Sequence, residues 1–148
     1  MATDSQYKAE VSSLELVPQD IQDYFSAFYA VSDSPNGHEK YADMFTQHAR
    51  LIMISNEANG RDEIFKMRQG MWEKVAKRSH KPKKIFAFGS GPGAEEYMLY
   101  GTVDYELKDG RKANVDWAAR AYFSREGKEV RMDFYQVYLD SAAMAKAK

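Results

Sequence analysis

The clearest pattern of hydrophobic and polar positions lies in residues 98–140, where three runs rich in Tyr, Val, Phe and Trp alternate with polar residues. Two short turn signals, Asp109-Gly110 and Glu126-Gly127, separate these runs. An Asp-Gly pair between alternating runs is typical of a hairpin in which both turn positions need a positive φ. The pattern therefore predicts an antiparallel meander of three long strands.

The residues before the meander predict mainly helices. Apolar residues recur at helical spacing over 18–31, 38–46 and 61–78, and Pro18 suits the first turn of its helix. Arg68 falls on the expected solvent side of the third helix. The nearly all-apolar segment 49–55 predicts a short strand buried on both faces, and another strand is expected to begin at 85–88. Helices followed by a run of strands predict an α+β fold with the helices on one face of the sheet.

Length and composition indicate one folded domain. The chain has 148 residues, of which 44% are hydrophobic and 14% aromatic, which excludes a largely disordered protein. We expect a loose arm over 1–15, a single domain over 16–141 and a frayed tail over 142–148. The N-terminus lacks the basic flank and apolar core of a signal peptide, and no apolar run reaches the roughly 20 residues that span a bilayer. A cytoplasmic protein without a membrane partner is therefore expected.

Charge and cysteine content exclude several classes of chemistry. The formal net charge of −1 argues against a nucleic-acid partner, which would need an excess of positive charge on one face. Cysteine is absent, so disulfides and thiol catalysis are excluded. His38, His48 and His80 are the only histidines, and no two of them share a helix face or strand at ligand spacing. We therefore expect no metal site.

Two motifs carry a family resemblance. The element order, together with GRKANVDWAAR at 110–120 and FYQVYLD at 134–140, resembles the SnoaL-like branch of the NTF2-like superfamily, in particular small fungal SnoaL-like proteins. The resemblance covers residues 18–141. It implies a cone in which three N-terminal helices pack on a strongly curved, mostly antiparallel sheet, with a ligand cavity and dimerisation through the convex sheet face. Relatives include polyketide cyclases, ketosteroid isomerase, scytalone dehydratase and non-catalytic binding modules, none of which implies a cofactor here.

The resemblance transfers few catalytic residues. Ala119 stands where ketosteroid isomerase has its oxyanion-stabilising Asp and where scytalone dehydratase has an Asn that contacts substrate. The segment 49–55 contains no carboxylate in place of the isomerase base. Tyr24 is a possible counterpart of the isomerase tyrosine on the first helix. The two strand histidines of scytalone dehydratase have no expected counterpart, so neither acid–base set is predicted.

The same gap-free alignment sets the expected strand phase. It points Val115, Trp117, Ala119 and Ala121 into the cone from one strand, and Met132, Phe134, Gln136 and Tyr138 from the next. The predicted ligand-binding residues are Tyr24, Phe28, Met53, Trp72, Trp117, Ala119, Phe134, Gln136 and Tyr138. Such a pocket would suit a flat aromatic ligand; the alternative is an ordinary packed core without a cavity. The amide of Gln136 could bind a ligand carbonyl or satisfy a neighbouring backbone or tyrosine group.

Four titratable or charged residues are weak catalytic candidates: His80, Asp116, Arg120 and Tyr24. His80 could act as a general base near the cone mouth, but an exposed helix end is the interpretation we favour. Asp116 and Arg120 are expected on the convex face, in an interface or a polar network with Tyr135. A phase shift of one residue would bring both into the cone.

Two hypotheses about function follow. In the first, the protein binds a small apolar or aromatic, polyketide-like molecule and catalyses an isomerisation, dehydration or cyclisation without a cofactor. In the second, it is a ligand-binding or dimeric interaction module that catalyses nothing. The missing acid–base set favours the second hypothesis, and the resemblance favours the first.

Overall fold

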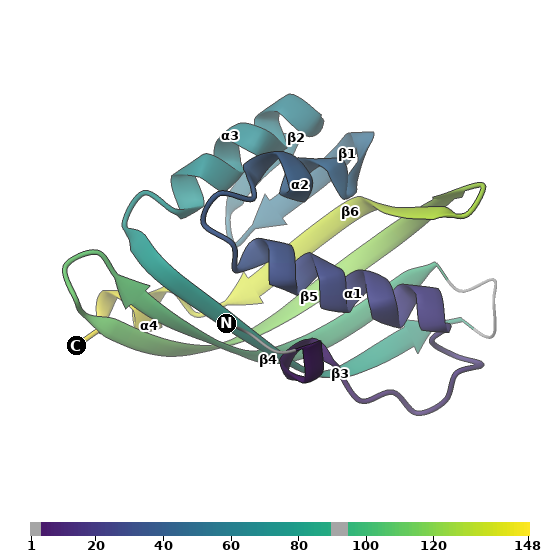
Figure 1. Cartoon of the computed structure of the whole chain (residues 1–148), viewed down its shortest axis with the longest axis horizontal. Coiled ribbons are helices and arrows are strands. Elements are labelled where there is room, and N and C mark those ends of the chain that lie inside the picture. Colours follow the sequence, from purple (N-terminus) through teal and green to yellow (C-terminus); the bar gives the residue numbers. More distant parts are fainter. Residues whose placement is uncertain (1–3, 90–94) are drawn as a thin grey trace.

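A curved six-stranded sheet with helices on its concave side forms the protein in a computed structural model, which describes residues 4–89 and 95–148 (Figure 1). The elements in chain order are the 3₁₀ helix η1 (Asp4–Tyr7), α1 (Gln19–Ser32), α2 (His38–Asp43), β1 (Phe45–Met53), β2 (Asn56–Asn59), α3 (Arg61–Met71), β3 (Val75–Phe88), β4 (Glu96–Leu107), β5 (Lys112–Glu126), β6 (Glu129–Leu139) and α4 (Ser141–Ala145). The α+β architecture predicted from the sequence is confirmed.

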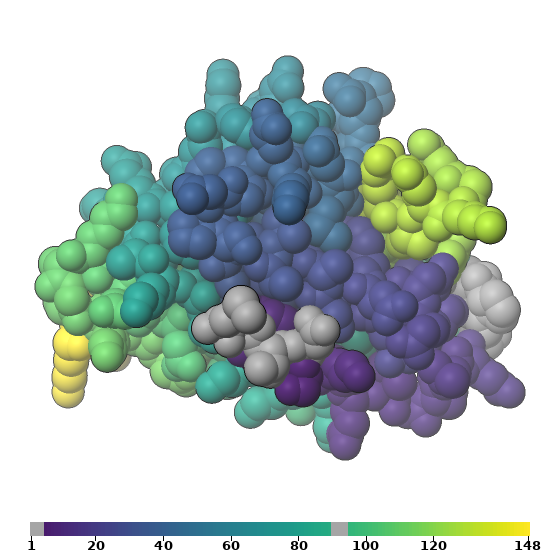
Figure 2. Space-filling view, in the orientation of Figure 1, coloured from purple at the N-terminus to yellow at the C-terminus, as the bar shows by residue number. Residues whose placement is uncertain are grey.

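The sheet has the strand order β2-β1-β6-β5-β4-β3, and all neighbours are antiparallel except β1 and β6. Strands β4, β5 and β6 form the predicted meander. Helix α1 lies across the concave face, and α2 and α3 cover the end that carries β1 and β2 (Figure 1). The space-filling view shows side chains of α1 and α2 over the middle of this face (Figure 2). The helices thus close the cone on one side.

The first hairpin turn differs from the expected two-residue turn. Gly110 has a φ of 92°, but Asp109 does not share the positive φ that was expected of both turn positions. Strand β4 ends at Leu107 and β5 begins at Lys112, so residues 108–111 connect the strands and the turn is longer than the expected two residues. The Asp109 carboxylate accepts a hydrogen bond of 3.1 Å from the backbone N–H of Arg111. Aspartate therefore stabilises this turn through its side chain.

The predicted strand phase is right for β5 and wrong for most of β6. Val115, Trp117, Ala119 and Ala121 are buried on the concave side, as expected. In β6 the register shifts, because Phe123 pairs with Met132 while Tyr122 pairs with Phe134. The extra residue is a β-bulge, and a bulge exchanges the two faces of the strand beyond it. The inward residues of β6 after the bulge are therefore Tyr135, Val137 and Leu139, whereas Phe134, Gln136 and Tyr138 lie on the convex side.

The segment 61–78 is a helix only as far as Met71, and β3 already begins at Val75, so the predictions of a helix to 78 and a strand from 85 are wrong. Strand β3 is an edge strand of the sheet. Edge strands carry charged residues, Lys above all, and Pro, which blunt pairing with other chains. The Lys-rich, Pro82-containing sequence therefore lacks the apolar alternation of a central strand.

The other differences concern β1 and the two ends. Ala49 and Leu51 of β1 are buried, but Arg50 is exposed and pairs with Glu57, so β1 is not buried on both faces as predicted. Tyr7 in the expected loose arm is buried. The expected frayed tail contains α4, and Lys148 exchanges two backbone hydrogen bonds with Lys112.

Aromatic residues from α1 form much of the core. Phe25, Phe28 and Tyr29 are each 1% exposed and pack against Trp117 and Tyr135 of the sheet and other rings. Full burial of such a side chain contributes roughly 1.5–3 kcal/mol. No helix within residues 4–89 and 95–148 is long and apolar enough to span a membrane.

Candidate active site

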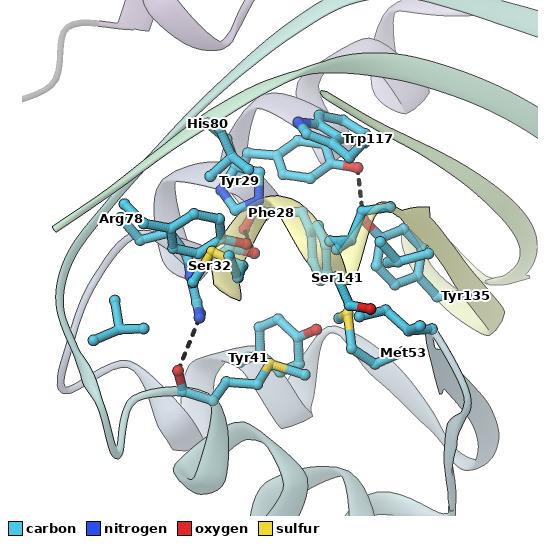
Figure 3. Close-up of a pocket in the computed structure, with 18 residues that line it drawn as sticks. Phe28, Tyr29, Ser32, Tyr41, Met53, Arg78, His80, Trp117, Tyr135 and Ser141 are labelled. Carbon is cyan, nitrogen blue, oxygen red and sulfur yellow. Dashed lines mark hydrogen bonds between the residues drawn. The ribbon is translucent and has the colours of Figure 1, made fainter. Parts of the chain in front are cut away.

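A cavity of about 220 Å³ lies between the concave face of the sheet and helices α1, α2 and α3 (Figure 3). Its lining is mainly aromatic and aliphatic, with a few polar groups. The lining residues are Phe28, Tyr29, Ser32, Tyr41, Met53, Ile54, Met71, Val75, Arg78, His80, Val103, Tyr105, Trp117, Tyr135, Val137, Leu139, Ser141 and Met144. An apolar cavity with a few convergent polar groups is the usual form of a small-molecule site.

The most distinctive polar residue of the cavity lining is His80, which is paired with Asp33 behind it. Asp33 is the residue that caps the C-terminus of α1, and His80 lies in the middle of β3. The distance from His80 Nδ1 to Asp33 Oδ1 is 2.6 Å, and the backbone N–H of His80 donates to Oδ2 at 2.8 Å. The side chains are 15% and 7% exposed, respectively. One carboxylate thus fixes both the backbone and the ring of the histidine.

The hydrogen bond to Asp33 determines the tautomer of the His80 ring. An ionised carboxylate only accepts hydrogen bonds, so Nδ1 carries the proton and Nε2 carries the lone pair. Nε2 has no hydrogen-bond partner among the residues that the structure describes. The hydroxyl of Tyr7 also donates to Asp33, at 2.8 Å, which secures the carboxylate from the other side. The pKa of Tyr7 is raised, chiefly by burial and then by this hydrogen bond.

Burial keeps the His80 imidazole neutral near pH 7. It lowers the pKa of His80 below the usual 6.5, and the positive charges of Arg78 and Arg68 act in the same direction. The hydrogen bond and the charge of Asp33 oppose this shift without overcoming it. A neutral, oriented imidazole whose free nitrogen has a lone pair is suited to accept a proton from a bound molecule.

Two tyrosine hydroxyls form a second polar group in the cavity. The hydroxyl oxygens of Tyr29 and Tyr135 are 2.7 Å apart, and both side chains are buried (Figure 3). Since one hydroxyl donates to the other, the acceptor of the pair keeps its own hydrogen to donate to a ligand oxygen. Burial raises the pKa of both hydroxyls well above 10, so both stay protonated. The rings of Tyr29 and His80 are 5.1 Å apart, so one small molecule could reach both groups.

Tyr41 adds a third hydroxyl, which points into the cavity in Figure 3. Burial raises the pKa of Tyr41 to about 12. Arg78 contributes a positively charged group to the cavity lining, and its guanidinium donates a hydrogen bond of 2.8 Å to the backbone carbonyl of Met71. In the part of the chain that the structure describes, no group of three His, Asp or Glu residues could hold a metal ion.

Four of the residues predicted as site residues line the cavity: Phe28, Met53, His80 and Trp117. For His80, the exposed helix end that we favoured is wrong, because the residue belongs to a strand and its ring faces inward. The chain therefore carries a histidine on a strand, which the sequence did not predict. There was little indication in the sequence of the strand around His80 or of its inward-facing ring, because the polar sequence of the edge strand β3 resembles the end of a helix.

The other predicted residues lie outside the cavity for identifiable reasons. Ala119 is buried in the core beneath it. The hydroxyl of Tyr24 bonds the backbone carbonyl of Met44 and has a structural role. Trp72 packs with Val75 and Leu107 in a separate small cluster.

The β-bulge in β6 explains the remaining misplacements. Phe134 and Gln136 lie on the convex face, where the guanidinium of Arg120 bonds Gln136 at 3.4 Å and lies 4.9 Å from the ring of Phe134. Tyr138 is 42% exposed, and Asp116 is also exposed. The predicted polar network of Asp116, Arg120 and Tyr135 is wrong, because Tyr135 lies on the concave side.

Sequence reasoning missed three residues of the site. Asp33 was assigned to a turn after the first helix, Tyr29 to the apolar stripe of that helix, and Tyr135 to the convex face. A polar residue directly after a helix gives no sign of its partner, since His80 lies 47 positions further along the chain. Only the three-dimensional fold brings these groups together.

No protein-family model matches the sequence, and the search of curated proteins finds no match. Solved structures do match. A candidate aromatic ring hydroxylase from Novosphingobium aromaticivorans shares 19% identity with a TM-score of 0.72, covering 81% of this chain and 89% of that one. A candidate scytalone dehydratase from the same organism shares 14% identity with a TM-score of 0.71, covering 81% of each chain.

A third match gives the fold its name. Nuclear transport factor 2 from Cryptosporidium parvum shares 12% identity with a TM-score of 0.65, covering 86% of this chain and 100% of that one. At these identities the matches establish a common fold. They include both proteins named for enzymes and a protein named for transport, so the function must come from the site itself.

Proposed function

We propose that this chain, which has the NTF2-like fold, is an acid–base enzyme that moves a proton on a small, largely apolar molecule in the cone cavity. The reaction class is isomerisation, dehydration or cyclisation, carried out by the side chains of the protein. The observation that carries the proposal is the buried His80–Asp33 pair: His80 lines a cavity together with the Tyr29–Tyr135 hydroxyl pair, and its Nδ1 is held by Asp33 while Nε2 has no partner among the described residues.

The first step transfers a proton from a C–H bond next to a ligand carbonyl to Nε2 of His80. The electrons of that bond move onto the carbonyl oxygen, which becomes an enolate. The Tyr29–Tyr135 pair supports this charge by donating a hydrogen bond, and Asp33 stabilises the imidazolium. His80 then returns the proton to another carbon in an isomerisation or to a leaving hydroxyl in a dehydration. The same group thus serves as base and then as acid.

Exchange of a C–H bond with solvent tests the first step without knowledge of the natural substrate. The protein is incubated in D₂O with a panel of small cyclic ketones, and loss of the C–H signal next to the carbonyl is followed by NMR. We expect the wild type to accelerate the exchange of at least one member and His80→Gln to abolish the acceleration. His48→Gln is the matched control, because His48 is exposed on β1. Equal exchange with wild type and His80→Gln would exclude His80 as the base.

The alternative function is binding without chemistry, which the predominantly apolar lining of the cavity also supports. Native mass spectrometry of protein purified from its own host would reveal a retained ligand. A retained ligand, together with no exchange on any ketone of the panel, would favour the binding module over the enzyme.

The convex face supports a further proposal, a homodimer. Phe86, Met98, Tyr100 and Tyr138 are each at least 39% exposed there, and the rings of Phe86 and Tyr100 are stacked. Exposed apolar patches of this kind often mark interaction sites. Light scattering during gel filtration should give twice the chain mass, and Tyr100→Lys should give a monomer. A monomeric wild type would contradict the proposal. A cytoplasmic location stays a prediction, to be tested by fractionation of the host.

A further inference from the structure

Two arginines and three aromatic rings form a chain of contacts at one end of the cavity, which we call the arginine–aromatic cluster. The guanidinium carbon of Arg68 lies 5.2 Å from the ring centre of Tyr41 and 5.0 Å from that of Trp72. The guanidinium carbon of Arg78 lies 4.9 Å from the ring centre of Trp72 and 5.3 Å from that of Tyr105. Cation–π contacts on both sides hold each planar group in place.

The hydrogen bonds of both guanidinium groups are incomplete. Arg68 is fully buried and uses Nη2 to donate to the carbonyls at the end of α1 and beyond, which belong to Val31, Ser32 and Ser34, at 3.1, 3.4 and 2.6 Å. Arg78 uses Nη2 for the carbonyl of Met71. The buried Nε of each arginine and Nη1 of Arg68 have no partner among the described residues. Among the described residues, the acceptors of these two guanidinium groups are uncharged: backbone carbonyls, and for Arg78 also the hydroxyl of Tyr105.

The charge at this end of the cavity is also unbalanced. Arg68 and Arg78 contribute +2, and Asp33 contributes −1, which leaves +1 while His80 is neutral. Asp33 is already engaged by His80 and Tyr7. Burial, with a smaller effect from the charge of Arg78, lowers the pKa of Arg68 to about 10, so this buried guanidinium still carries its charge at neutral pH. A buried positive charge without a full counter-charge is costly, and an anionic ligand would supply the missing charge.

We propose that Arg78 binds a carboxylate of the ligand, so that the cavity takes a compact aryl or cyclic carboxylic acid. The inference rests on the proposed function for the position of the reacting carbon. Arg78 and His80 both line the cavity and are two residues apart on β3. Because a strand rises about 3.4 Å per residue, their Cα atoms are about 7 Å apart. The carboxylate and the acidic C–H of the ligand should therefore be separated by a similar span, as across one ring.

The size of the cavity fits this class of molecule. A cavity of about 150 Å³ accommodates benzene, and the present one is larger, at about 220 Å³. It therefore has room for one substituted ring or two fused rings. The forked guanidinium of Arg78 can bind both oxygens of a carboxylate, whereas Lys would offer a point charge. Arg78 is thus expected to determine the preference for acids over neutral molecules. Arg68, which contacts the same Trp72 ring, adds a second positive charge close to this site.

Paired acids and amides test the proposal directly. Binding of 2-naphthoate and of its neutral analogue 2-naphthamide, and of benzoate and benzamide, is measured by calorimetry at neutral pH. We expect the wild type to prefer the acid in at least one pair by tenfold or more. Arg78→Met should remove the preference, and Arg78→Lys should retain part of it. Lys77→Met is the matched control, because Lys77 is exposed on the same strand; it should keep the full preference.

The outcomes separate this proposal from the proposed function. His80→Gln should lose ketone exchange but keep the preference for acids, whereas Arg78→Met should lose the preference whatever its rate of exchange on neutral ketones. Equal binding of acid and amide by the wild type, no binding of either pair, or a preference that survives in Arg78→Met would each overturn the role of Arg78. Thermal melts of both arginine variants show whether they are folded, and Arg78→Lys keeps the test open if Arg78→Met is not.

Discussion

Asp33 holds His80 through two hydrogen bonds, one to ring Nδ1 at 2.6 Å and one to the backbone N–H at 2.8 Å. The first bond fixes the tautomer of the ring, and the second fixes the position of β3 relative to the end of α1. Because the same carboxylate makes both bonds, the orientation of the base is coupled to the packing of the helix on the sheet. The result is a buried histidine whose Nε2 has no hydrogen-bond partner among the described residues.

Asp33→Asn should reduce the rate of ketone exchange by about 10²–10⁴-fold, the usual contribution of a well-placed acid–base group. An amide cannot stabilise the imidazolium as a carboxylate does, and its NH₂ group can hold the ring in the wrong tautomer. The measurement is the same NMR exchange assay. Asp23→Asn, on the exposed side of α1, should leave the rate unchanged, and equal losses in both variants would point to a general effect on folding.

The pH dependence follows from the lowered pKa of His80. The base form is present above that pKa, so exchange should be retained as pH falls to 6.5 and should be lost at lower pH. Stability should depend on pH in the same direction, because below pH 6.5 the folded state binds fewer protons at His80 than the unfolded state does. The contribution of the neutral His80 to the free energy of unfolding is therefore fully present above pH 6.5 and is lost as the pH falls through the folded pKa. His80→Gln should remove this part of the acid sensitivity in melts. A midpoint of activity above 6.5 would contradict the direction of the shift.

The Tyr29–Tyr135 hydroxyl pair predicts a non-additive mutant cycle. Either single substitution by Phe leaves one buried hydroxyl without its partner, at a cost of about 1–3 kcal/mol. The double variant removes both polar groups and should cost less than the sum of the two single changes. Chemical denaturation gives the three free energies of unfolding. Additive losses would show that the hydroxyls do not depend on each other.

The meander could be predicted because local alternation and turn residues determine it, and the phase of β5 followed from the gap-free alignment with the family, since no bulge lies before Ala121 in this strand. The phase of β6 could not, because the bulge near Asp133 arises where β6 meets β1 and β5, and β1 lies about eighty positions earlier in the chain. The site depended on that phase, since it determines whether Tyr135 or Gln136 faces the cavity. The resemblance predicted a cavity correctly, but on β6 it pointed Gln136 and Tyr138 into it in place of Tyr135.

Two glycines provide a matched pair for packing. A Cβ at Gly101 of β4 would overlap the carbonyl oxygen of Lys81 and would lie 2.8 Å from the Cα of Pro82, and both are backbone atoms that cannot easily move. A Cβ at Gly70 in α3 would meet nothing within 4 Å. Gly101→Ala should therefore lower the melting temperature, while Gly70→Ala should raise stability by up to about 1 kcal/mol through helix propensity. A stable Gly101→Ala variant would show that β3 can shift away from β4.

Ile54 combines backbone strain with a place in the cavity. It is the one described non-glycine residue with a positive φ, 60°, and this conformation is unfavourable for a β-branched residue by roughly 1–2 kcal/mol. Its side chain lines the cavity, and its N–H donates to the carbonyl of Val137 at 3.1 Å. Strain at such a position is often retained for function.

Substitution of Ile54 should therefore separate stability from ligand binding. In Ile54→Gly, relief of the strain offsets the lost apolar contacts, so the free energy of unfolding should stay within about 1 kcal/mol of the wild type. Ile52→Gly removes the same atoms from a regular position in β1 and should be clearly more destabilising. Binding of 2-naphthoate should weaken in Ile54→Gly, because the cavity loses part of its wall. If Ile54→Gly instead loses as much stability as Ile52→Gly while binding is unchanged, the residue is retained for packing and not for the ligand.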